Sequence, residues 1–96
     1  MKRTPSNLVF HELIGLRVDV VSHSDPSLVG LKGVVVWEIR NMLFIKNSRG
    51  KIVKVLKQYG TFRFYLPSGV AVEVSGTSIL GRPDERLKRA RDRFRW

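Results

Sequence analysis

The chain has 96 residues and a mass of 11.0 kDa, a length typical of one small domain. Its 18 Lys and Arg residues outnumber 8 Asp and Glu residues, and the resulting charge of +10 predicts a polyanionic partner. The absence of cysteine excludes disulfides, a thiolate nucleophile and zinc sites with Cys ligands. No apolar run reaches the roughly 20 residues of a membrane helix, and no signal-peptide pattern opens the chain. We therefore expect a soluble, cytoplasmic protein with no membrane role.

Three regions are expected within a single domain over residues 1–96. Residues 1–15 should form a helical extension, with Ser6 or Asn7 capping a short helix over Leu8–Leu13. Residues 16–80 alternate with period two, as half-buried strands do, and residues 81–96 return to a helical pattern.

Turn-forming residues divide the middle region into six expected strands. These are Leu16–Val20, Leu31–Ile39, Met42–Asn47, Lys51–Lys57, Thr61–Leu66 and Val70–Ser75. Their connections are too short for crossover helices, so the strands should be antiparallel. Closure into a small all-β barrel of the Sm-like or SH3-like kind would remove exposed edges.

The alternation also predicts which side chains face the interior. In the last two strands the inward set is Phe62, Phe64, Leu66, Val70, Val72 and Val74, and the outward set is Arg63, Tyr65 and Glu73. The second strand is apolar on both faces. We expect Val35 and Trp37 to line the barrel, whereas Val34 and Val36 face outward and need cover from a helix or a partner.

The C-terminal region is expected to be a basic helix that begins at Pro83, a residue suited to the first helical position. Residues 82–96 hold seven basic and three acidic residues. The apolar stripe of Leu87, Ala90 and Phe94 is too narrow for insertion into a membrane surface, so nucleic acid is the better partner.

No constellation of catalytic groups stands out. The run from Ser22 to Asp25 contains the residue types of a hydrolytic triad, but neighbours in an extended chain point apart, which favours a turn. His11 and Glu12 diverge on a helix and lack a third group. We therefore expect no catalytic residue, no metal site and no bound cofactor in this chain.

Basic residues on strands, turns and the last helix are the candidates for binding RNA phosphates. They are Arg17, Lys32, Arg40, Asn41, Lys54, Lys57, Arg63, Arg82, Arg86, Lys88, Arg89 and Arg93, where Asn41 joins the set as a polar neighbour of Arg40. Lys46 is a further outward cation. Phe44, Tyr59, Tyr65 and Trp96 could stack on unpaired bases, although each is more often a packing residue.

Five strings in order along the chain resemble the archaeal ribonuclease P protein component 1 family. They cover residues 11–16, 29–35, 40–43, 61–64 and 81–88 (HELIGL, VGLKGVV, RNML, TFRF and GRPDERLK). The resemblance implies an Sm-like six-stranded barrel that is a protein subunit of an RNA-based endonuclease. That enzyme removes 5′ leaders from precursor transfer RNA, and its RNA, with Mg²⁺, carries the chemistry.

The resemblance also implies two partners, the ribonuclease P RNA and a zinc-ribbon protein subunit, with precursor tRNA met through the holoenzyme. The protein partner would contact the N-terminal segment and the adjacent barrel surface. On this sequence that surface maps to Leu8, Phe10, Leu13, Val34 and Val36.

Two alternatives remain at this point. A generic barrel module would bind ribosomal or messenger RNA without a zinc-ribbon partner. A small barrel that coats duplex DNA would raise the duplex melting temperature without preferring RNA.

Overall fold

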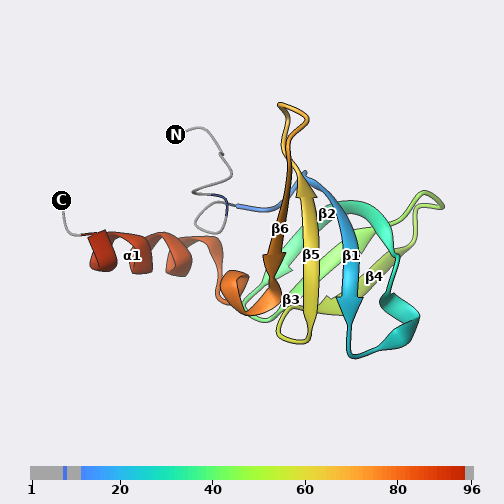
Figure 1. The fold of residues 1–96 in the computed structure, drawn as a ribbon, viewed down its shortest axis with the longest axis horizontal. Helices are drawn as coiled ribbons and strands as arrows, with labels where there is room; N and C mark the ends of the chain where they lie inside the picture. Colours follow the sequence, from blue (N-terminus) through green and yellow to red (C-terminus); the bar gives the residue numbers. More distant parts are fainter. Residues whose placement is uncertain (1–7, 9–11, 95–96) are drawn as a thin grey trace.

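The described part of the fold contains six strands, the 3₁₀ turns η2 and η3, and the helix α1 (Figure 1). The computed structural model describes residues 8 and 12–94, with side chains in the last helix only as far as residue 88. The strands are β1 Arg17–His23, β2 Lys32–Ile39, β3 Met42–Lys46, β4 Ile52–Leu56, β5 Gly60–Tyr65 and β6 Ala71–Ser75, the 3₁₀ turns are η2 Pro26–Leu28 and η3 Gly76–Ile79, and the helix is α1 Pro83–Phe94.

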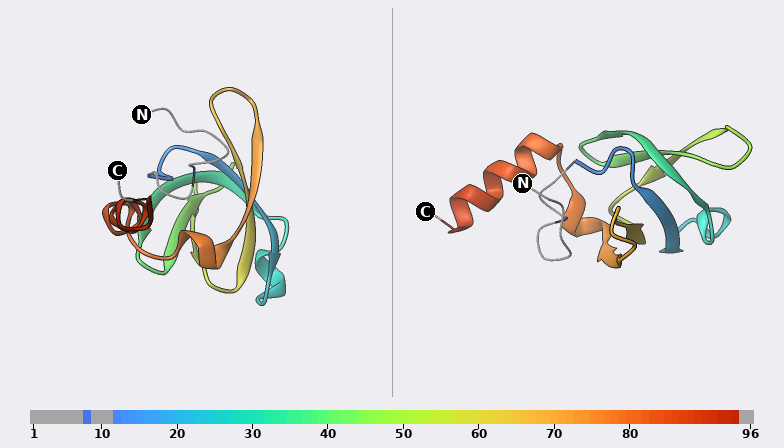
Figure 2. Two further views of the ribbon diagram at one scale, coloured as in Figure 1. Left: turned by 60° about the vertical axis from the view of Figure 1, so that its left-hand side comes forward. Right: turned by 90° about the horizontal axis from the view of Figure 1, so that it is seen from above.

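All six strands belong to one antiparallel sheet with the order β4-β3-β2-β1-β5-β6. The six-stranded all-β prediction is thus confirmed. The sheet is strongly curved (Figure 2), but its ladders end at β4 and β6, so the described strands form an unclosed sheet and not the closed barrel expected. Curvature lets one sheet enclose its own core without a second layer.

Among the residues that the structure describes, thirteen apolar side chains are buried inside the curve of the sheet and form one cluster. They are Leu8, Leu13, Leu16, Val18, Val20, Val35, Leu43, Ile45, Val55, Phe62, Phe64, Leu66 and Ile79. A fully buried side chain of this size contributes about 1.5 to 3 kcal/mol to folding. The chain leading into β1 therefore belongs to the core through Leu8 and Leu13.

The register predicted for the fifth and sixth strands is largely confirmed. Phe62 and Phe64 of β5 are fully buried and Val72 and Val74 of β6 pack against the core. Val70 is the exception, because it lies in the turn before β6 and is exposed.

The register predicted for β2 is wrong beyond Val35. The pairing of β2 with β3 shifts between Val35 and Trp37, where Val36 is the extra residue of a bulge. A bulge moves every later side chain to the opposite face. Val35 is buried as expected, but Trp37 is 57% exposed and Glu38 takes the inward place. Trp37 therefore does not line the core, and its truncation would leave no cavity.

The two ends of the sheet meet at Gly76, the first residue of η3. A Cβ added there would collide with the backbone carbonyl of Lys57, directly after β4. Only glycine allows this close approach of two backbones. The η3 turn then leads to α1, which projects from the sheet (Figures 1 and 2).

Helix α1 begins at Pro83, as predicted. Residues 9–11 of the expected N-terminal helix over residues 8–13 lie outside the described residues, and Glu12 and Leu13, which are described, are not helical. No described helix is long and apolar enough to span a membrane.

Candidate nucleic-acid interface

A buried ion cluster of Glu38, Lys57 and Arg86, here called the Glu38 cluster, lies where β2 ends and α1 begins. The Arg86 guanidinium donates to both oxygens of the Glu38 carboxylate, at 2.7 Å to Oε1 and 3.2 Å to Oε2. Lys57 Nζ donates to Oε1 at 3.0 Å, and the backbone N–H of Leu13 donates to Oε2 at 3.0 Å. One carboxylate therefore joins four segments that are far apart in sequence.

Backbone carbonyls complete the coordination of the two cations. Arg86 Nη1 lies 2.6 Å from the oxygen of Gly81 and 3.2 Å from that of Ile79. Lys57 Nζ lies 3.1 Å from the oxygen of Gly81 and 3.4 Å from that of Arg40. Two buried positive charges with one negative charge are tolerated because these carbonyl dipoles supply further negative potential.

Burial and pairing act against each other on the pKa values of this cluster. Burial raises the pKa of the Glu38 carboxyl. The contacts with Arg86, Leu13 and Lys57 lower this pKa by more than burial raises it, so the pKa lies below its usual value. Burial lowers the pKa of the Lys57 ammonium by more than the contact with Glu38 raises it. Glu38 is thus held as a carboxylate by its donors.

The Glu38 cluster corrects two of the residues predicted to bind RNA. Lys57 is 0% exposed and Arg86 is 1% exposed, so neither can reach a phosphate at the surface. Their charges are used inside the protein, where they fix α1 and the segment after β4 to the end of β2. The sequence pattern missed this cluster because its members are separated by 19 and 48 residues.

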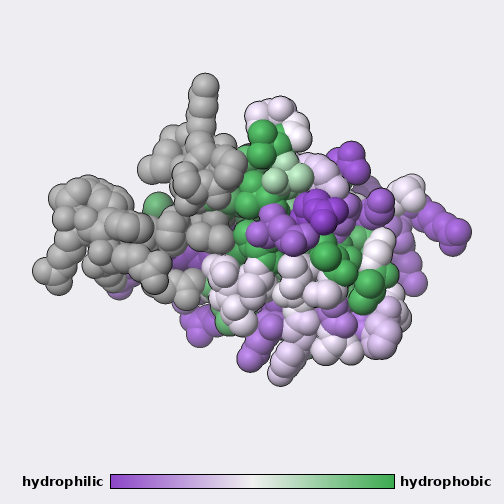
Figure 3. All heavy atoms as spheres, in the orientation of Figure 1, coloured by the Kyte–Doolittle hydropathy of each residue, from purple (hydrophilic) through white to green (hydrophobic). Residues whose placement is uncertain are grey.

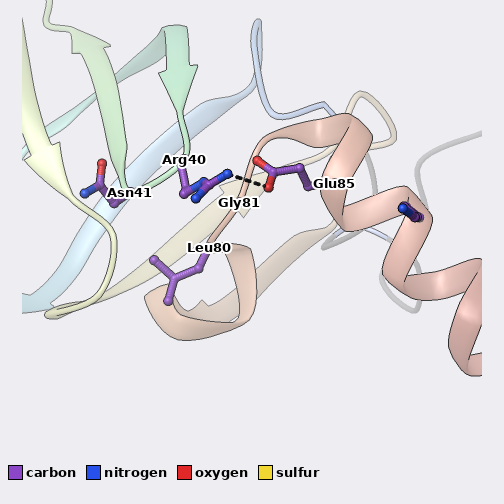
Figure 4. A pocket seen from close by; sticks show the side chains of 6 residues that line it. Arg40, Asn41, Leu80, Gly81 and Glu85 are labelled. Carbon is purple, nitrogen blue, oxygen red and sulfur yellow. Dashed lines mark hydrogen bonds and ion pairs between the residues drawn. The ribbon is translucent and has the colours of Figure 1, made fainter.

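A pocket of about 510 Å³ lies beside the cluster, between the β2–β3 turn and α1 (Figure 4). Its lining residues are Arg40, Asn41, Leu80, Gly81, Glu85 and Lys88. Three of the predicted RNA-binding residues, Arg40, Asn41 and Lys88, are therefore brought to one place from two distant segments. All three are exposed.

Glu85 connects the two walls of the pocket. Its Oε1 accepts from the backbone N–H of Arg82 at 3.0 Å, as a third helical residue does in a capping box, and its Oε2 accepts from Arg40 at 3.0 Å. The Arg82 amide and the Arg40 guanidinium hold the pKa of the Glu85 carboxyl below its usual value. Arg82 itself is exposed next to the pocket.

Four further predicted cations lie on the strands of the sheet. Arg17 lies over the Tyr65 ring at 5.0 Å, Lys32 is exposed on β2, and Arg63 is paired with Glu73 at 2.9 Å. Figure 3 shows hydrophilic residues interspersed with apolar ones on the face it displays. Lys54 is exposed on β4, and the side chains of Arg89 and Arg93 lie outside the described set.

The outer face of β2, β3 and β4 carries exposed apolar side chains together with two lysines, Lys46 and Lys54. Cross-strand pairs place Val34 beside Lys46 and Ile52, Trp37 beside Phe44 and Lys54, and Ile39 beside Met42 and Leu56. Val34, Trp37, Ile52 and Leu56 are all exposed. Of the residues predicted to contact a protein partner, Val34 lies on this face and Val36 is the half-buried bulge residue. Leu8 and Leu13 are in the core, and Phe10 is outside the described residues.

Within the segment from Ser22 to Asp25, Ser22 and His23 are the last residues of β1, and only Ser24 and Asp25 form the bend that the sequence indicated. His23 Nδ1 accepts from the backbone N–H of Asp25, which leaves Nε2–H to donate to the carbonyl of Leu56 at 2.9 Å. The Asp25 carboxylate accepts from Ser27. Both ring nitrogens therefore have structural partners. Within residues 8 and 12–94, no three His, Asp or Glu side chains converge as metal ligands.

Known proteins are similar to this chain in sequence and in fold. Residues 6–89 match the family model described as ribonuclease P/MRP, subunit p29. The chain is 52% identical over 89 residues to ribonuclease P protein component 1 of Hyperthermus butylicus, covering 93% of this chain and 80% of that protein. It is 47% identical over 88 residues to that of Staphylothermus marinus, covering 92% and 96%.

A solved structure, titled as a homologue of the human RNase P protein Rpp29, has the same architecture. It superposes with a TM-score of 0.60 at 39% sequence identity, covering 79% of this chain and 97% of that one. The family resemblance predicted from five short strings is therefore confirmed along most of the chain. This chain belongs to the ribonuclease P/MRP subunit p29 family.

Proposed function

We propose that this chain is the RNA-binding protein subunit of ribonuclease P and supports RNA-catalysed removal of the 5′ leader from precursor tRNA. The proposal rests on two observations: the chain belongs to a ribonuclease P subunit family, and exposed cations gather in one part of its surface. Arg40, Arg82 and Lys88 gather where α1 leaves the sheet, while the two cations that are buried hold that helix in place.

In this proposal the chain contributes binding and the RNA contributes chemistry. The described residues offer fixed cations and a pocket but no acid, base and nucleophile in mutual contact. Mg²⁺ would serve the RNA catalyst, and this chain would need no metal of its own. The soluble, cytoplasmic location expected from the sequence accompanies this role as part of the proposal.

The test is the salt dependence of binding to ribonuclease P RNA. Each phosphate that a Lys or Arg contacts releases condensed counterions, so the logarithm of the affinity should fall against the logarithm of salt with a slope of about −0.7 to −0.9 per contact. We expect a total slope of roughly −3 or steeper for several contacts. Filter binding over a salt series measures it.

Two comparison ligands separate the proposal from its alternatives. A fragment of ribosomal RNA and a DNA duplex of equal length, titrated at the same salt, should bind more weakly than ribonuclease P RNA. Equal affinity for ribosomal RNA would favour a generic RNA-binding module. A slope near zero would show that the charge of +10 is only a solvated surface.

We also propose that the zinc-ribbon protein subunit of ribonuclease P binds the outer face of β2, β3 and β4. The support is the apolar character of this face, where Val34, Trp37, Ile52 and Leu56 are exposed. Exposed apolar side chains clustered on one face are typical of protein interfaces. The bulge at Val36 is what adds Trp37 to this face.

A further inference from the structure

The pocket between the β2–β3 turn and α1 has the properties of a site for a single nucleotide. We propose that it takes one nucleotide of an RNA strand, with the phosphate between Arg40 and Lys88 and the sugar or base against Leu80 and Asn41. This inference rests on the proposed function, since it names the place on the chain where that RNA would be held.

The charges that line the pocket favour an anion. Arg40 and Lys88 are positive and Glu85 is negative, so the lining carries a net positive charge. The side chain of Arg40 is 72% exposed and reaches Glu85 across the pocket at 3.0 Å (Figure 4). Solvent screens an ion pair this exposed and leaves it weak, so a phosphate with two anionic oxygens can replace Glu85 as the partner of Arg40.

The backbone on both sides of the pocket is held rigidly. The N–H of Gly81 donates to the carbonyl of Arg40 at 2.6 Å, which joins the segment before α1 to the β2–β3 turn. Gly81 has a φ of 95°, a left-handed conformation that favours glycine. The buried Lys57 ammonium donates to the carbonyls of Arg40 and Gly81, and the Arg86 guanidinium also donates to the carbonyl of Gly81.

This support gives the Glu38 cluster a second consequence. A binding site whose walls are fixed before the ligand arrives loses less conformational entropy on binding. Arg40 and Lys88 project from backbone segments that the buried charges hold in place. The long side chains can then adjust to the ligand while their points of attachment do not move.

The size and the neutral lining fit a nucleotide better than a bare phosphate. A volume of about 510 Å³ exceeds what a phosphate needs and lies in the range of small-ligand sites. Leu80 is half-buried and offers an apolar surface for a sugar or base. The exposed Asn41 amide can both donate and accept, as contacts to a base edge or a 2′-hydroxyl require.

Paired charge removal tests the site. The Arg40→Gln, Lys88→Gln double variant should weaken binding to ribonuclease P RNA by roughly tenfold or more at fixed salt, because two charge-assisted contacts are lost. The control is Arg49→Gln with Lys51→Gln, which removes the same charge from the β3–β4 turn, at the opposite end of the molecule from α1 (Figure 1). The control should weaken binding by no more than about threefold.

Glu85→Gln adds a test with the opposite sign. Glutamine retains an oxygen that can accept from the Arg82 amide, so the helix start is preserved while the negative charge is removed. Binding to ribonuclease P RNA should tighten by several fold, because the Glu85 carboxylate no longer competes with a phosphate for Arg40. A weaker complex would overturn the proposal.

The outcomes separate this inference from the proposed function. If the wild-type chain binds ribonuclease P RNA with a steep salt slope but both double variants weaken binding equally, the pocket is not the site and the RNA-binding role stands. If the wild-type chain does not bind that RNA, the proposed function fails. Circular dichroism melting of each variant checks that the fold is intact.

Discussion

Replacing Glu38 with glutamine is expected to lower the free energy of unfolding by roughly 3 to 5 kcal/mol, a large part of the stability of a small domain. Glutamine has nearly the same shape but carries no charge, so Lys57 and Arg86 would be left as two buried cations without an anion. Urea unfolding followed by circular dichroism measures the change.

A surface ion pair gives the matched control. Glu73→Gln removes the same charge by the same chemistry from the exposed pair with Arg63. That change should alter stability far less than Glu38→Gln does, because solvent screens the exposed pair. If Glu38→Gln and Glu73→Gln had equal small effects, the Glu38 cluster would not be what holds α1 and the N-terminal segment on the sheet.

In acid, the free energy of unfolding should depend on pH differently in Glu38→Gln and in the wild type. The pKa of Glu38 is lower in the folded state than its usual value of 4.5. The unfolded chain therefore binds the proton more readily, and the stability contributed by the carboxylate is present above pH 4.5 and lost as the pH falls through the folded pKa. The wild-type advantage over Glu38→Gln should shrink in this window.

Placing two aspartates on the apolar outer face, Val34→Asp with Trp37→Asp, should weaken association with the zinc-ribbon subunit by about a hundredfold or more. Charges brought into a dry interface would be buried without partners. The isolated chain should stay folded, because both side chains are exposed and neither lines the core. Calorimetric titration with the purified subunit measures the loss.

Two valines elsewhere provide the control for this variant. Val29 and Val70 are also exposed but lie in turns away from the outer face of β2, β3 and β4. Val29→Asp with Val70→Asp should leave the affinity for the subunit unchanged. If Val34→Asp with Trp37→Asp bound the subunit normally, the partner would dock elsewhere on the chain.

Strand positions and much of the core were predictable from local pattern. The alternation in β5 predicted that Phe62 and Phe64 face inward, and the turn residues predicted the strand ends to within a few positions. The resemblance of five short strings predicted the family. These features depend on neighbours in sequence, which is why one sequence is enough to read them.

The change of the inward face along β2, after the bulge at Val36, was not predictable in this way. A strict period of two placed Trp37 inside, and nothing local marks Val36 as the residue of a bulge. The bulge turns Glu38 inward, where its carboxylate accepts hydrogen bonds from Lys57 and Arg86. These contacts exist only in the folded chain. The sequence shows that these three residues are charged, but it does not show that they are neighbours in space.

The candidate site was predicted only in part for the same reason. Arg40, Asn41 and Lys88 were recognised as residue types suited to RNA, but their convergence on one pocket depends on the Gly81 contact with the β2–β3 turn. Composition gave the charge of the surface. Distinguishing exposed cations from buried ones required the fold.

The most direct test of the account is cleavage of precursor tRNA by reconstituted ribonuclease P in the presence of Mg²⁺, with the RNA and this chain omitted in turn. The account predicts that the 5′ leader is removed only when the RNA is present, and that omitting this chain reduces the rate by weakening assembly. Leader removal by this chain without any RNA component would contradict the proposal that the RNA carries the chemistry.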